Sequence, residues 1–71
     1  MEIDIYITSK QGLPEIIRFK SAHEALSYSR RAVKNSSVES PRKVTWIGRD
    51  SSLHYTPVSD WYDAISVIKA L

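Results

Sequence analysis

The stretch Glu2-Ile3-Asp4-Ile5-Tyr6-Ile7-Thr8 decides the fold. Its three isoleucines alternate with polar side chains and a tyrosine over seven residues. Because successive side chains of a strand point to opposite faces of a sheet, this alternation predicts a half-buried strand. The isoleucine face has to be covered by another layer, and the other face is left open.

The next residues predict a hairpin. Residues 9–12 have turn chemistry and include Gly12, which tolerates a positive φ. A second strand is expected over residues 14–20, with Ile17 and Phe19 pointing inward and Ile16 outward.

A capping box then predicts the start of a helix. The Ser21 hydroxyl can accept from the Glu24 amide, and the Glu24 carboxylate can reach back to the Ser21 amide. The helix is expected to end near Asn35 and to be followed by a polar loop. Its buried face combines small and apolar side chains: Ala22, Ala25, Leu26, Ser29 and Val33.

The second half repeats this order of elements. A strand over residues 43–49 is expected to alternate Val44 and Trp46 inward with Thr45 and Ile47 outward. In a fourth strand over residues 53–58 the parity stays open, so that its outward pair is either His54 with Thr56 or Leu53 with Tyr55. Ser59 or Asp60 caps a last helix, with a buried stripe at helical spacing: Trp61, Ala64, Ile65, Ile68 and Leu71.

These elements predict one small α+β domain over residues 1–71. The expected fold is ββαββα, with a single four-stranded antiparallel sheet in the order 2-1-3-4 and both helices on one face. This order makes the two most apolar strands central and puts Pro57 on an edge, where a missing donor does little harm. Arg18 and Lys20 then lie on the other edge strand, where charge discourages edge-to-edge pairing. A shift of 39 residues aligns the two helices and suggests pseudo-two-fold packing.

Composition excludes several classes of protein. The chain has no cysteine, which removes disulfides, thiol nucleophiles and cysteine-ligated metals, and this favours the reducing cytoplasm. Its acidic first residues do not resemble a signal peptide, and no apolar run is long enough to span a membrane. Two glycines leave no phosphate-binding loop, so no cofactor and no small-molecule substrate is expected.

Catalysis and metal binding are not expected either. Asp50, Ser51, Ser52 and His54 lie close in sequence, but a short turn supplies neither an oriented base nor an oxyanion site. His23 and His54 lack neighbours at metal-ligand spacing. The sequence therefore predicts a non-catalytic binding or regulatory protein.

The first functional hypothesis is protein binding through the open sheet face, either to another protein or to a second copy in a homodimer. Exposed apolar side chains beside an aromatic one are typical of an interaction surface. The residues expected on this face are Tyr6, Ile16, Arg18, Lys20, Ile47 and Arg49.

The alternative hypothesis is nucleic-acid binding through a basic helix and loop. The net charge is only +2, but nine of the ten basic residues and three of the eight acidic ones fall between positions 10 and 49. Basic side chains at helical spacing can contact successive phosphates. The residues of this expected patch are Arg30, Arg31, Lys34, Arg42 and Lys43.

Overall fold

The structure, a computed structural model, describes residues 1–35 and 38–71. Residues 36 and 37, which belong to the expected polar loop, lie outside the described residues. The order of elements is ββαββα, as the sequence predicts: β1 (Ile3–Thr8), β2 (Pro14–Phe19), α1 (Ala22–Lys34), β3 (Pro41–Ile47), β4 (Leu53–Pro57) and α2 (Trp61–Lys69).

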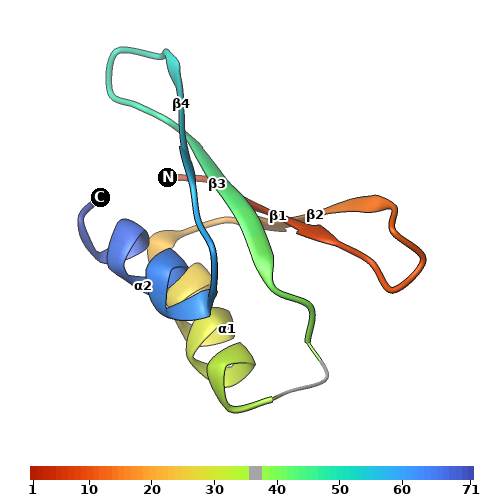
Figure 1. Cartoon of the computed structure of the whole chain (residues 1–71). Coiled ribbons are helices and arrows are strands. Elements are labelled where there is room, and N and C mark those ends of the chain that lie inside the picture. The colour runs from red at the N-terminus through yellow and green to blue at the C-terminus, as the bar shows by residue number, and fades with distance from the viewer. Residues whose placement is uncertain (36–37) are drawn as a thin grey trace.

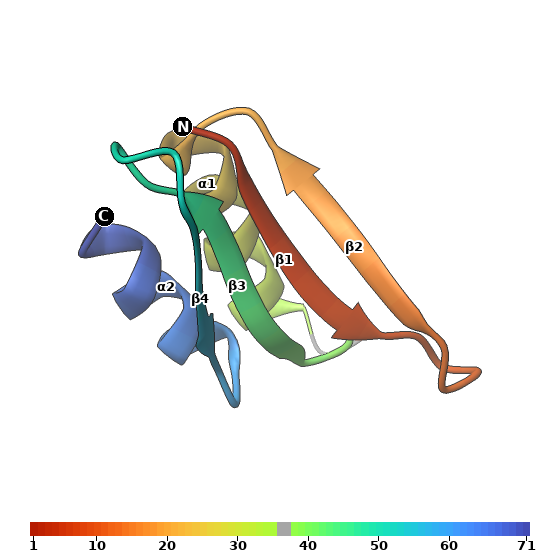
Figure 2. The same cartoon turned by 90° about the horizontal axis from the view of Figure 1, so that it is seen from above.

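The four strands form one sheet in the order β2-β1-β3-β4, with every neighbouring pair antiparallel. This confirms the predicted sheet. Figures 1 and 2 show both helices on the same side of it, so the other side is left uncovered by described residues. The β1–β2 hairpin extends beyond the helices at one end of the sheet. No helix in the described part of the chain has the length and apolar character needed to span a membrane.

The core lies between the isoleucine face of β1 and the two helices. Ile3 and Ile5 are fully buried, and α1 packs beside α2 beneath them. The Tyr28 ring lies between the rings of Phe19 and Trp61, with centroids 5.3 and 5.6 Å away. These aromatic contacts join β2, α1 and α2, and they link the first half of the chain to its last helix.

Trp61 is buried, as its helical stripe predicts, and its indole Nε1 donates to the Glu39 carbonyl oxygen at 3.0 Å. A buried indole needs such a partner. The bond ties the segment before β3 to the start of α2.

The buried face of α1 differs in part from the prediction. Ala25, Ser29 and Ala32 are buried, whereas Leu26 and Val33 are only partly so. The stripe is rotated toward Ala32 because α1 packs against α2 as well as against the sheet. The hydroxyl of Ser29 donates to the Ala25 carbonyl oxygen at 2.7 Å, which satisfies a polar group inside the core.

Two strand ends also differ from the prediction. β2 ends at Phe19, so Lys20 follows the strand, and β3 ends at Ile47, so Arg49 lies in the β3–β4 turn. β3 also begins earlier than expected, at Pro41. Its register with β1 shifts between Tyr6 and Ile7, which leaves Arg42 as an extra residue.

Both helices begin with the same hydrogen-bonded arrangement. Ser21 Oγ accepts from the Glu24 amide at 3.2 Å, and Asp60 Oδ1 accepts from the Asp63 amide at 2.7 Å. The Glu24 and Asp63 carboxylates each accept a hydrogen bond from the backbone amide of the residue before the cap, which is Lys20 in α1 and Ser59 in α2. The sequence predicts the Ser21 amide as the donor to Glu24, so this partner differs from the prediction by one residue. All of these positions are related by the same 39-residue shift that aligns the two helices.

Candidate functional site: the open face of the sheet

The open face is the side of the sheet that the helices do not cover. Side chains directly opposite each other in neighbouring strands share a face. Asp4 pairs with Thr45, and Thr45 pairs with Tyr55, so Tyr55 lies on the open face and so does Leu53, two residues before it. This settles the parity that the sequence leaves open. His54 and Thr56 are on the helix side.

Large apolar side chains are exposed on the open face. Ile16 and Ile47 are about half exposed, at 53% and 49%, and Leu53 and Tyr55 are each 66% exposed. Thr45, in the middle of the face, is only 5% exposed because its neighbours surround it. The face is therefore apolar toward β4 and densely packed at its centre.

A two-bond ion pair crosses from β1 to β2. Arg18 Nε donates to Asp4 Oδ1 at 2.9 Å, and Arg18 Nη2 donates to Asp4 Oδ2 at 3.0 Å. These hydrogen bonds, with the negative charges of Asp4 and Glu2, raise the pKa of Arg18. The Asp4 side chain is only 17% exposed, so the pair satisfies a largely shielded carboxylate on the face.

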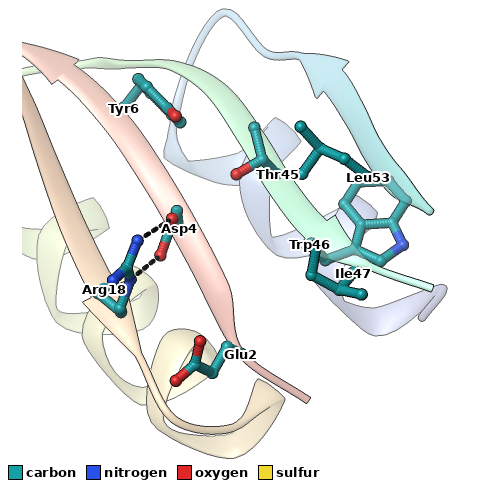
Figure 3. Close-up of a pocket in the computed structure, with 8 residues that line it drawn as sticks. All are labelled: Glu2, Asp4, Tyr6, Arg18, Thr45, Trp46, Ile47 and Leu53. Carbon is teal, nitrogen blue, oxygen red and sulfur yellow. Dashed lines mark hydrogen bonds and ion pairs between the residues drawn. The ribbon is translucent and has the colours of Figure 1, made fainter. Parts of the chain in front are cut away.

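A hollow of about 380 Å³ lies beside this ion pair (Figure 3). The Asp4–Arg18 pair borders it on one side, and Ile47 and Leu53 border it on the other. The remaining lining residues are Glu2, Tyr6, Thr45 and Trp46. The hollow thus joins an apolar wall to a polar wall whose main charges are already paired.

The other end of the face carries what we call the tyrosine–lysine cluster: Tyr6, Lys43 and Tyr55. The Lys43 Nζ lies 4.4 Å from the centroid of the Tyr6 ring and 5.7 Å from that of Tyr55. Nearby, Arg42 Nη1 donates to the Thr8 hydroxyl at 2.9 Å. Two cations and two aromatic rings are therefore gathered where β1, β3 and β4 meet.

The structure does not bring the expected basic patch together. Arg30, Arg31 and Lys34 are exposed on α1, on the covered side of the sheet. Lys43 and Arg42 contact open-face side chains instead. The five residues are therefore divided between α1 and the start of β3, and their joint binding of nucleic acid stays a prediction. The alternation that places Thr45 and Ile47 outward also places Lys43 outward, and this signal was present in the sequence.

The expected protein-binding face is brought together in part. Tyr6, Ile16, Arg18 and Ile47 share the open face. Lys20 and Arg49 lie beyond the strand ends, where alternation no longer sets the direction of a side chain. The sequence prediction assigns Lys43 to the basic patch and not to this face. It leaves Leu53 and Tyr55 open, because the pattern of the fourth strand does not fix its parity.

A second polar cluster occupies the β3–β4 turn. The carboxylate of Asp50 accepts from the Ser52 hydroxyl at 2.6 Å and from its amide at 3.1 Å, and these bonds lower the pKa of Asp50. His54 Nε2 lies 3.1 Å from the Ser52 hydroxyl and 3.6 Å from Asp50, and its ring stacks on Trp46. A triad needs the carboxylate on the far nitrogen of the histidine. Here a single nitrogen faces both partners.

The His54 ring also packs against Gly48, where an added Cβ would lie 2.5 Å from Nε2. The contacts among Asp50, Ser52 and His54 thus hold the β3–β4 turn closed against Gly48. Among residues 1–35 and 38–71, no group of three or more His, Cys, Asp or Glu side chains is placed to hold a metal ion.

Comparison of the chain with protein-family models, with curated proteins and with solved structures finds no match.

Proposed function

We propose that the chain is a non-catalytic binding protein that acts in the cytoplasm and holds another protein against the hollow of its open face. The observation that carries this proposal is the exposure of Ile47 and Leu53 beside a hollow whose shielded carboxylate is already paired. Exposed apolar groups around a concave site are typical of surfaces that bind a partner.

The pairing of Asp4 with Arg18 lowers the cost of covering the face. A buried charge without a partner is strongly unfavourable, whereas this carboxylate accepts two hydrogen bonds within the chain. A partner can therefore cover the hollow without supplying a group for Asp4. Its apolar side chain would gain about 25 cal/mol for each Å² of apolar surface removed from water.

Glu2 indicates the charge of the partner. It lies at the rim of the hollow, and no ion pair of its own is formed with the described residues. With Asp4 neutralised by Arg18, the rim retains a negative charge. We therefore expect the partner to place an aliphatic or aromatic side chain in the hollow and a lysine or arginine beside Glu2.

The test is a pull-down from the native lysate with the tagged wild-type chain, with Ile47→Lys and with the matched control Tyr62→Lys. Tyr62 is 68% exposed but lies on α2, away from the open face. We expect one protein to be retained by the wild type and the control, to be lost with Ile47→Lys, and to survive nuclease treatment. Retention by Ile47→Lys at the wild-type level would contradict the proposal.

A further inference from the structure

The proposed protein site centres on Ile47 and Leu53 at the hollow and gives no role to Lys43 and Tyr55; of the tyrosine–lysine cluster, only Tyr6 also lines the hollow. The cluster draws on three neighbouring strands, since Tyr6 is on β1, Lys43 on β3 and Tyr55 on β4. Lys43 is directly opposite Tyr6 in the sheet, and Tyr55 is diagonal to it. The strand pairing therefore fixes the two rings on either side of one ammonium group.

The cations at this end of the face are available to an anion. Within the described residues, neither Lys43 nor Arg42 forms an ion pair with a carboxylate. The nearest open-face acid along the sheet, Asp4, is engaged by Arg18 through both oxygens. Among the described residues, Arg42 donates to the neutral hydroxyl of Thr8 and pairs with no carboxylate, so its charge is oriented but not compensated.

We propose that the tyrosine–lysine cluster, together with Arg42, binds single-stranded nucleic acid. The Tyr55 ring is 66% exposed and offers a surface on which a base can stack. Aromatic side chains on a sheet stack unpaired bases, and neighbouring lysine and arginine side chains hold the phosphates. Lys43 and Arg42 are placed to hold phosphates, close to the Tyr55 ring on which a base can stack.

This geometry favours a single strand over a duplex. In a duplex the faces of the bases are already stacked on each other, so Tyr55 could not reach them without unstacking. Stacking accepts every base, and the cluster offers no set of side chains arranged to read base edges. We therefore expect DNA and RNA strands to bind with little sequence preference.

The test is a titration of fluorescein-labelled ten-nucleotide strands, oligo(dT) and oligo(rU), followed by anisotropy at several salt concentrations. Tyr55→Ala is compared with Tyr62→Ala, since the two tyrosines are exposed to the same extent, at 66% and 68%. Loss of one stacking ring should weaken binding by about 5-fold or more. Tyr62→Ala, on α2, should bind as the wild type does.

The charge is tested with a second matched pair, Lys43→Gln and Lys69→Gln. Two phosphate contacts on a single strand predict a log–log salt slope near −1.4, and removal of one contact should reduce its magnitude by about 0.7. Lys43→Gln should show this reduction. Lys69→Gln, at the end of α2, should keep the wild-type slope.

Several results would overturn the proposal. These are no binding of either strand at low salt, equal losses with Tyr55→Ala and Tyr62→Ala, or binding that depends on Arg30 and Arg31 of α1 instead. Near-ultraviolet circular dichroism of each variant shows whether a loss reflects unfolding. A preference of oligo(rU) over oligo(dT) would reflect the 2′-hydroxyl or the missing thymine methyl group, and it would leave the site in place. The proposal does not depend on a protein partner, because Ile47→Lys changes a side chain that lines the hollow, whereas Tyr55→Ala removes a ring that does not line it.

Discussion

Asp4 on β1 and Arg18 on β2 are held together by two hydrogen bonds, of 2.9 and 3.0 Å, on the face of the sheet that the helices leave open. Their Cα atoms are direct partners in the strand register. The pair borders the hollow, and its row across the sheet continues through Thr45 to Tyr55 of the tyrosine–lysine cluster. It also explains how a carboxylate can lie largely shielded on a face that we expect to be covered by a partner.

Asp4→Asn should lower the melting temperature slightly, because it replaces an ion pair by a weaker hydrogen bond between edge strand and centre. Since the Arg18 side chain is largely exposed, salt should screen the attraction. Thermal melts at 0.05 and 1 M NaCl test this. The difference between wild type and variant should shrink at high salt, and a difference that is unchanged would show that the pair acts through shape and not charge.

Ser21→Ala should cost about 1 kcal/mol of unfolding free energy, because the Glu24 amide loses its acceptor at the start of α1. Urea denaturation measures this value. Ser27→Ala, inside the same helix, is the control and should be close to neutral. If the two variants melt alike, the serine hydroxyl does not contribute to capping.

Ser52→Ala should raise the pKa of Asp50 toward its ordinary value of 3.8, since the hydroxyl and amide of Ser52 are the main causes of its lowering. A carboxyl group whose pKa is lowered by folding stabilises the fold above its unfolded pKa. That contribution is lost as the pH falls through the folded value, which here is below 3.8. NMR titration of the Asp50 side chain follows the shift. An unchanged titration curve in the variant would mean that the hydroxyl contact is not kept in solution.

Ile47→Lys should leave the fold intact, because the side chain is about half exposed and lies on the open face. Circular dichroism and a thermal melt check this, and Ile5→Lys, at a fully buried position, should unfold the chain. If the wild type forms a dimer, light scattering should show that Ile47→Lys dissociates it. A dimer that persists in this variant would place self-association elsewhere.

The arrangement of strands and helices could be predicted from the sequence, because alternation in residues 2–8 and the cap at Ser21 are local signals that packing reinforces. The inward direction of Val44 and the burial of Trp61 follow from the same periodicities and are confirmed. Each of these residues belongs to a run of apolar side chains that repeats at the spacing of its own strand or helix. Local and tertiary preferences agree there.

The candidate site was harder to predict because it depends on strand ends and on one irregularity. The shift of register after Tyr6 makes Arg42 an extra residue in β3, and no pattern in the sequence marks it. β4 is an edge strand with mostly exposed side chains, so periodicity did not reveal that Leu53 and Tyr55 face outward. The rotation of α1 toward Ala32 depends on α2, a contact between distant parts of the chain.

Binding of a partner protein by the open face is tested most directly by site-specific photo-crosslinking in the native lysate. A photoreactive phenylalanine analogue is placed at Leu53 on the open face or at Tyr62 on α2, two positions exposed to 66% and 68%. We expect one crosslinked protein from position 53 and none from position 62, with competition by excess wild-type chain and not by Ile47→Lys. Crosslinks that form equally at both positions, or only at position 62, would contradict it.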